Sequence, residues 1–180
     1  MIFTEISCLA SNLWLGLRTP PFEIPLISLL PFPIFIIVAL GIGFYSGLFH
    51  FGFLNRKIGF LLFFTTFVFP SFLEEAFFRG LLIPNDAIQH GIGHILLYLF
   101  LSTLLFVLWH PLNALTINPG AASFFLNPSF LLITALLGLT CGISYILSHS
   151  LWIPVIIHWL TVLMWVFFLG GRNKILELWR

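Results

Sequence analysis

Long apolar stretches separated by short polar breaks fill most of the chain. Five of them approach the length of a membrane-crossing helix: residues 26–49, 58–83, 93–110, 130–148 and 153–169. A helix needs about 20 mainly apolar residues to cross a bilayer. Prolines and glycines interrupt several stretches, which membrane helices tolerate because neighbouring helices satisfy the freed backbone groups. The pattern predicts an all-α fold, a polytopic transmembrane helical bundle with about five membrane-spanning helices.

Residues 1–18 follow a different pattern, with apolar positions three and four apart on one face. Leu9, Leu13 and Leu17 belong to that face, and Asn12 belongs to the opposite one. This spacing predicts an amphipathic helix that lies in the membrane interface; a frayed tail is the alternative interpretation. Prolines follow at positions 20, 21 and 25. We therefore divide the chain into an N-terminal interfacial segment, residues 1–25, and a transmembrane domain, residues 26–180.

The composition supports a membrane protein. Hydrophobic residues make up 60% of the 180 positions and charged residues only 7%, whereas soluble domains carry about 25% charged residues. The net charge is +1 and no basic stripe is present, so nucleic acid is not an expected partner. The expected surroundings are a lipid bilayer.

Basic residues flank the predicted spans unequally. Five of them follow the first and fifth spans, which end on the same side, namely Arg56, Lys57, Arg172, Lys174 and Arg180. Arg18 stands alone on the other side. Because basic residues concentrate on the cytoplasmic side of membrane proteins, we predict an external N-terminus and a cytoplasmic C-terminus.

The second apolar stretch contains three ionisable residues close together, Glu74, Glu75 and Arg79. Charged groups in hydrocarbon are costly and mark functional sites or protein-facing positions. Glu75 and Arg79 are four residues apart, so a helix places them on one face where they form an ion pair. Glu74 points about 100° away from that pair. It is left without a local partner, which suits a carboxylate acting as a general base.

Histidines in two other stretches are the remaining candidates for proton transfer. His110 precedes Pro111, which predicts that the third helix ends at this histidine. His158 follows Pro154 by four residues, which predicts a kink near the histidine. A single histidine in a membrane helix more often makes an interhelical hydrogen bond than it catalyses a reaction. Here, however, three separate spans each supply one such group.

These residues match three motifs in order. Residues 74–79 read E-E-x-x-x-R, residues 106–110 read F-x-x-x-H, and His158 stands where a third histidine motif, H-x-x-x-N or H-x-x-x-D, begins. Together they resemble the CPBP family, which includes CAAX proteases and bacteriocin-processing enzymes and is also called the Abi family. The resemblance covers roughly residues 60–171. It implies that residues 26–180 are a CPBP-like transmembrane domain.

The resemblance implies an intramembrane endopeptidase of the bacterial inner membrane that acts on a peptide or a membrane-anchored protein. Glu74 would activate a water molecule and His110 would help to position it. Arg79 would pair with Glu75 and support the helix. His158 and an Asn or Asp four residues later would stabilise the oxyanion. This chain has Val162 at that later position, and Thr161 is the nearest substitute donor.

Two other interpretations remain open. Glu74, His110 and His158 are also a plausible zinc ligand set, although we place metal-free hydrolysis first. Val162 favours a different class, a membrane scaffold or bacteriocin self-immunity protein that keeps the fold and is catalytically impaired. A proton-coupled transporter is a third class, which the lack of an internal repeat disfavours.

The depth of the candidate residues sets a condition on the fold. Straight helices would hold Glu74 and His110 too far apart to share a water molecule, at about 1.5 Å of rise per residue. The second helix must therefore bend or end near Pro70, or residues 84–93 must lie within the membrane. The connector at residues 111–128 is uncharged, and we interpret it as a segment that is partly re-entrant or that caps the cavity.

Overall fold

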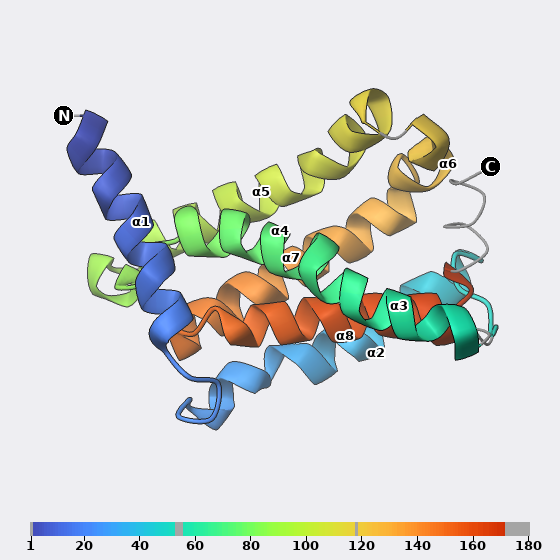
Figure 1. Ribbon diagram of the computed structural model, residues 1–180, viewed down its shortest axis with the longest axis horizontal. Helices are drawn as coiled ribbons and strands as arrows, with labels where there is room; N and C mark the ends of the chain where they lie inside the picture. The colour runs from blue at the N-terminus through green and yellow to red at the C-terminus, as the bar shows by residue number, and fades with distance from the viewer. Residues whose placement is uncertain (1, 53–55, 118, 172–180) are drawn as a thin grey trace.

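The computed structural model describes residues 2–52, 56–117 and 119–171. Within these ranges the protein is built from helices and contains no β-strand, which confirms the predicted all-α class. The long helices run roughly side by side along the longest axis of the molecule (Figure 1). Arg172, Lys174 and Arg180, on which the predicted orientation partly depends, lie outside the described residues.

The helices follow one another along the chain with short connections. In order they are α1 (Ile2–Arg18), η1 (Leu26–Leu29), α2 (Pro31–Tyr45), α3 (Arg56–Thr66), η2 (Phe67–Phe72), α4 (Leu73–Glu75), η3 (Ala76–Leu81), η4 (Ala87–His90), α5 (Ile92–Thr116), η5 (Pro119–Ala121), α6 (Ala122–Phe125), α7 (Pro128–Ser148) and α8 (Trp152–Phe168). Segments η2 and η3 have π-helical geometry, whereas η1, η4 and η5 are short 3₁₀ turns.

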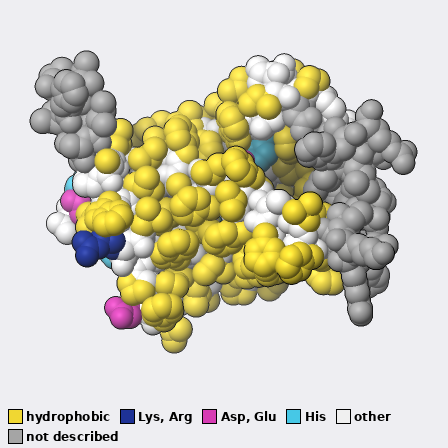
Figure 2. Space-filling view, in the orientation of Figure 1, with side chains coloured by type: hydrophobic (Ala, Val, Ile, Leu, Met, Phe, Trp, Pro, Cys, Tyr) yellow, Lys and Arg dark blue, Asp and Glu magenta, His cyan; other side chains and the backbone are white. Residues whose placement is uncertain are grey.

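Four helical segments among the described residues are long and apolar enough to cross a membrane: Leu26–Tyr45, Gly59–Leu81, Ile92–Thr116 and Pro128–Ser148. The fifth predicted span corresponds to α8, which is equally apolar but has only 17 residues. Hydrophobic side chains also dominate the surface seen in Figure 2, with charged side chains near one end. Length, composition and surface together identify a polytopic, multi-pass membrane protein.

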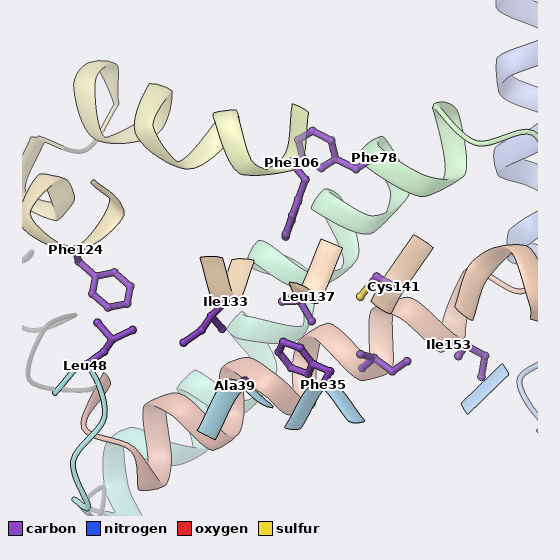
Figure 3. Packing of buried hydrophobic residues seen from close by; sticks show 11 residues of the cluster. Phe35, Ala39, Leu48, Phe78, Phe106, Phe124, Ile133, Leu137, Cys141 and Ile153 are labelled. Carbon is purple, nitrogen blue, oxygen red and sulfur yellow. The ribbon is translucent and has the colours of Figure 1, made fainter. Parts of the chain in front are cut away.

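Helix α7 lies in the middle of the bundle, where it packs against α2, α5 and α8. Its buried residues face a cluster in which Phe35 of α2, Leu137 of α7 and Ile153 of α8 lie together (Figure 3). Phe106 of α5 closes the same cluster and is fully buried. The cluster fixes α5 and α8 relative to each other, which matters because each carries a candidate histidine.

The second predicted span is broken near Pro70, which is one of the alternatives that the depth of Glu74 left open. Phe69 has φ −122° and ψ 120°, values outside the helical region, and Pro70 follows it. Proline has no backbone N–H to donate and disfavours helical geometry at the preceding residue. Of the alternatives left open, the structure has the bend near Pro70, and the short π-helical and α-helical turns after it carry Glu74, Glu75 and Arg79.

Two predictions based on proline were wrong. Helix α5 does not end at His110 but continues through Pro111 to Thr116. A membrane helix tolerates the loss of the single backbone hydrogen bond that proline removes, because neighbouring helices hold the helix in place. Helix α8 begins at Trp152, so Pro154 stands in its first turn and α8 runs on through His158 to Phe168. The carbonyl that Pro154 leaves free belongs to Ser150 and accepts a bond from the Ser148 hydroxyl at 3.3 Å.

The connector after α5 packs back onto the bundle, which agrees with its interpretation as a cap. The ring of Phe124 in α6 stacks on Trp165 of α8, with centroids 4.7 Å apart. The ring of Phe125 packs edge-on against that of His110, with centroids 5.3 Å apart. The segment therefore covers the end of α5 that carries this histidine.

The opposite end of the bundle ties the chain's first helix to the loop before α8. The backbone N–H of Leu151 donates to the carbonyl of Gly16 at 2.9 Å. The indole of Trp152 donates to the backbone carbonyl of Leu17 at 2.9 Å, and the hydroxyl of Ser150 donates to the backbone carbonyl of Thr19 at 2.8 Å. The N-terminal helix that the sequence predicted is thus present; its position in the membrane interface stays a prediction.

Candidate active site

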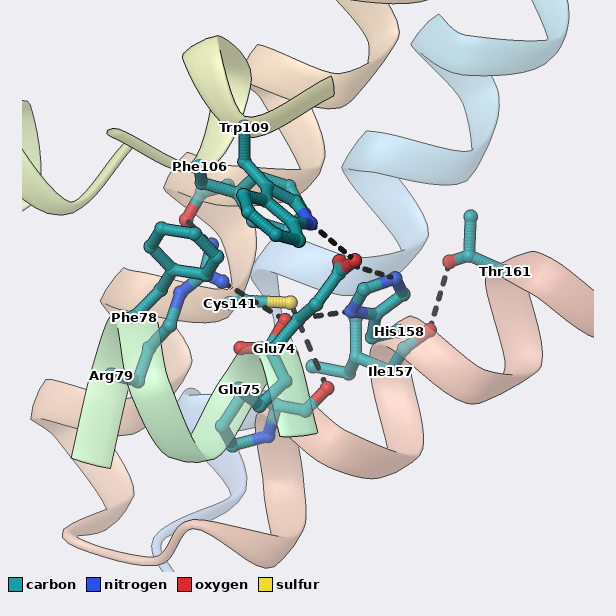
Figure 4. Close-up of polar contacts among 12 residues, drawn as sticks. Glu74, Glu75, Phe78, Arg79, Phe106, Trp109, Cys141, Ile157, His158 and Thr161 are labelled. Carbon is teal, nitrogen blue, oxygen red and sulfur yellow. Dashed lines mark hydrogen bonds and ion pairs between the residues drawn. The ribbon is translucent and has the colours of Figure 1, made fainter. Parts of the chain in front are cut away.

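Three parts of the fold bring polar side chains to one place inside the bundle (Figure 4). The broken span supplies Glu74, Glu75 and Arg79. Helix α5 supplies Trp109, and α8 supplies His158. The buried ring of Phe106 lies against both Arg79 and His158. Residues far apart in sequence thus form one cluster.

Glu75 is the hub of the cluster and has no exposed side-chain surface. Its Oε1 accepts a hydrogen bond from Nη1 of Arg79 at 3.0 Å, so the predicted pair is present. The same oxygen accepts from Nδ1 of His158 at 2.8 Å. A buried carboxylate is stable only when paired and hydrogen-bonded, and here two partners share that task.

Arg79 is held on three sides. Its Nη2 donates to the carbonyl oxygen of Gly138 at 3.0 Å, and its Cζ lies 4.4 Å from the centroid of the Phe106 ring. A Cβ atom at position 138 would lie 3.0 Å from Cγ2 of Thr103 and 3.4 Å from Nη2 of Arg79. Glycine therefore allows α7 to approach the guanidinium closely.

Glu74 has a different environment from its neighbour. Its Oε1 accepts a hydrogen bond from Nε1 of Trp109 at 3.2 Å. Its Oε2 has no hydrogen-bond partner and lies 3.9 Å from Nε2 of His158. The side chain is 16% exposed, whereas those of Glu75 and Arg79 are 0% exposed. Oε2 of Glu75 is likewise buried without a hydrogen-bond partner, so what distinguishes Glu74 is its partly exposed side chain and the approach of its Oε2 to Nε2 of His158.

His158 lies between the two carboxylates. Because a carboxylate oxygen only accepts hydrogen bonds, the 2.8 Å contact with Glu75 places a proton on Nδ1. The neutral ring then carries its lone pair on Nε2, which is the nitrogen that faces Glu74. The ring also packs edge-on against Phe106, with centroids 5.7 Å apart. Glu75 therefore sets both the orientation and the tautomer of His158.

His110 lies beside this cluster, in an aromatic setting. Its Nδ1 donates to the backbone carbonyl of Phe106 at 2.9 Å. Its ring packs against Phe106, Phe125 and Phe130, with centroids 5.2–5.4 Å away. Over the described ranges no hydrogen bond joins His110 to Glu74 or His158; the indole of Trp109 makes the bond from α5 instead.

Thr161, the predicted substitute donor, turns its hydroxyl to its own helix. Its Oγ1 donates to the carbonyl oxygen of Ile157 at 2.8 Å, as Figure 4 shows. The hydroxyl proton is thus engaged one turn back along α8 rather than directed at Glu74.

Two residues of the site, Trp109 and Gly138, were not predicted from the sequence. Trp109 carried a signal, because an indole N–H in an apolar span needs an acceptor and Glu74 was the carboxylate without a local partner. Gly138 carried none, since its role depends on how closely α7 approaches Arg79.

A metal-ligand arrangement is not formed by the predicted residues. In the part of the chain that the structure describes, no three His, Cys, Asp or Glu side chains are grouped so that they could hold a metal ion. What the site does contain is a carboxylate with a free oxygen beside an oriented imidazole. That pair can accept, hold and return a proton.

Comparison with known protein families gives one match that spans more than half of the chain. Residues 55–164 match the family described as type II CAAX prenyl endopeptidase Rce1-like. The matched segment includes Glu74, Glu75, Arg79, Trp109 and His158. No curated protein and no solved structure matches the chain.

Proposed function

Because this chain belongs to the Rce1-like family of type II CAAX prenyl endopeptidases, we propose that it hydrolyses a peptide bond within the membrane using a water molecule that Glu74 activates. The substrate is a peptide or a membrane-anchored protein. One observation carries the proposal: Oε2 of Glu74 is unpartnered and lies 3.9 Å from Nε2 of an oriented histidine. A general base needs an oxygen that can accept a proton and that is held within reach of the water molecule.

The reaction follows from the positions of these two groups. Glu74 takes a proton from water, and the resulting hydroxide forms a bond to the carbonyl carbon while the carbonyl electrons move to oxygen. His158, which takes a proton from solvent on Nε2 before the attack and keeps it throughout, donates a hydrogen bond through that N–H to the oxygen that gains charge. The C–N bond then breaks, and the leaving nitrogen takes the proton held by Glu74. Burial strengthens both effects because few water molecules compete.

Glu75 and Arg79 support this reaction without touching the substrate. Glu75 holds Nδ1 of His158 at 2.8 Å, and Arg79 compensates the buried carboxylate at 3.0 Å. A protonated His158 would therefore keep its orientation, since its Nδ1–H stays on Glu75. We assign both residues a supporting role.

His110 and Thr161 are given smaller roles. With Nδ1 of His110 on the Phe106 carbonyl, the neutral ring carries its lone pair on Nε2, which suits it to accept a hydrogen bond from the attacking water. Thr161 would have to release the carbonyl of Ile157 before it could stabilise an oxyanion. We therefore propose that Thr161 supports α8 and that His158 is the main donor.

The proposal requires no metal ion, because Glu74 and His158 themselves supply the proton transfer. Hydrolysis should then proceed at an unchanged rate in the presence of a zinc chelator such as 1,10-phenanthroline. Loss of activity on chelation, with recovery on added Zn²⁺, would instead support zinc held by Glu74, His110 and His158.

The decisive experiment is cleavage by the purified protein in lipid vesicles. The probe is a fluorescence-quenched peptide that ends in a prenylated cysteine and three further residues. Removing a general base lowers rates by about 10²–10⁴-fold, so Glu74→Gln should lose activity to that extent. Glu23→Gln is the matched control, because Glu23 is exposed in the connection before η1. A Glu74→Gln enzyme as fast as wild type would refute the assignment.

A second candidate function is a catalytically impaired scaffold or bacteriocin self-immunity protein. Val162, which stands where the resembling family has Asn or Asp, is the observation that favours it. The same experiment separates the two. A wild-type protein that cleaves no peptide, together with a Glu74→Gln variant that works as well as wild type in cells, would support the scaffold.

A further inference from the structure

We propose that Trp109 is a positioning residue for hydrolysis: its indole N–H fixes Oε1 of Glu74, so that Oε2 is the oxygen presented to His158 and to water. This inference rests on the proposed role of Glu74. It adds a residue on α5 at a position that the F-x-x-x-H motif leaves unspecified.

The two oxygens of Glu74 have unequal surroundings. Oε1 accepts from Nε1 of Trp109 at 3.2 Å, and Oε2 has no hydrogen-bond partner. The two oxygens of an isolated carboxylate are equivalent, and rotation about its last side-chain bond exchanges them. A donor bound to one oxygen removes that freedom. Trp109 therefore determines which oxygen faces Nε2 of His158 at 3.9 Å.

Tryptophan suits this role chemically. An indole nitrogen only donates hydrogen bonds, so it cannot take the proton that Glu74 must receive. Its rigid ring, part-buried beside His110, also needs little ordering when the substrate binds. A hydroxyl or imidazole at the same position would compete for the proton.

Three other indoles, on α8, make different contacts. Nε1 of Trp152 donates to the carbonyl of Leu17 and Nε1 of Trp159 to the carbonyl of Phe63. Nε1 of Trp165 is buried without a partner. Backbone carbonyls thus satisfy two of these three indoles, whereas the indole of Trp109 donates to a carboxylate of the site.

The first test replaces the donor and keeps the aromatic ring. A hydrogen bond to a charged group contributes about 1.5–3 kcal/mol, which corresponds to roughly 10–100-fold in rate. Trp109→Phe should therefore lower kcat for the prenylated peptide by about 10–100-fold. KM should stay unchanged, because the indole holds the base and not the substrate. Trp159→Phe is the matched control and should retain the wild-type kcat.

A double-mutant comparison separates positioning from packing. In a Glu74→Gln background, Trp109→Phe should cause no further loss, because the oriented base is already gone. An equal loss in both backgrounds would overturn the inference, as would a Trp109→Phe enzyme with the wild-type kcat. If Glu74→Gln is itself fully active, the proposed function fails. If Glu74→Gln is impaired but Trp109→Phe is as fast as wild type, the proposed function stands and the positioning role of Trp109 is refuted.

A spectroscopic test needs neither turnover nor a folded Trp109 variant. In protein labelled with ¹⁵N-tryptophan, Glu74→Ala should shift one indole N–H resonance, whereas Glu23→Ala should shift none. Where Trp109→Phe folds, the same resonance should be missing from its spectrum. Unchanged indole resonances in Glu74→Ala would contradict the hydrogen bond on which the inference depends.

Discussion

At the scale of single residues, the adjacent Glu74 and Glu75 have different hydrogen-bond partners. Glu75 uses Oε1 to hold Arg79 and His158, and neither it nor Arg79 has exposed side-chain surface. Glu74 is partly exposed, and its Oε2 lies 3.9 Å from Nε2 of His158 without a hydrogen-bond partner. The sequence predicted the Glu75–Arg79 pair because spacing of four residues is a local property. The bond from His158 to Glu75 could not be predicted, since it depends on where α8 lies.

The buried pair leads to a stability prediction. Breaking a buried ion pair by removing one partner costs about 3–5 kcal/mol, because the other charge is left uncompensated. Arg79→Met should therefore lower the free energy of unfolding in detergent by about that amount. Adding Glu75→Gln should recover part of the loss, because no unpaired carboxylate remains. Thermal unfolding measures both variants, and wild-type stability in Arg79→Met would show that the pair contributes little.

At the scale of helices, the site depends on close packing between α7 and its neighbours. The carbonyl of Gly138 meets Arg79, and the space beside this glycine is filled by Thr103 and Phe106 of α5. The sequence predicted the helices, because apolar runs act locally, and it offered the bend near Pro70 as one of the alternatives that would bring Glu74 and His110 together. It failed at Pro111, where packing against α6 and α7 outweighs a proline's preference.

This packing can be tested by filling the space. Overpacking a close-packed interior costs about 1–3 kcal/mol, so Gly138→Val should lower the unfolding temperature and displace Arg79. Gly41→Val is the control, because a Cβ atom at position 41 meets no atom within 4 Å. The control should unfold at the wild-type temperature. Equal behaviour of the two variants would mean that α7 has room to move.

At the scale of the whole molecule, the family match and the fold overlap only in part. The match covers residues 55–164, whereas α1 and α2 precede it. We therefore keep as a proposal the division into an interfacial segment, residues 1–25, and a CPBP-like transmembrane domain, residues 26–180. The loop before α3 is joined to the end of α8 by a 3.0 Å bond from Gly52 N–H to the Phe168 carbonyl. Both segments thus emerge on one side of the bundle.

We propose that the end of the bundle where Gly52 contacts Phe168 faces the cytoplasm of a bacterial inner membrane. Basic residues favour the cytoplasm, and Arg56 and Lys57 stand near the end of the bundle that Gly52 and Phe168 mark. A green fluorescent protein fused to the C-terminus should fluoresce, and alkaline phosphatase fused there should be inactive. The same two reporters on the N-terminus should behave in the opposite way. Active phosphatase at the C-terminus would reverse the assignment.

The bonds between residues 16–19 and 150–152 also bear on how a ribosome-bound chain matures. The last carbonyls of a helix lack partners within that helix, and those of Gly16, Leu17 and Thr19 find theirs about 130 residues later. The hydrogen bonds at the end of α1 therefore form only after the residues just before α8, and the start of α8 itself, have been synthesised. A nascent chain halted before residue 150 would lack the protein donors for these carbonyls, which water would then have to hydrate.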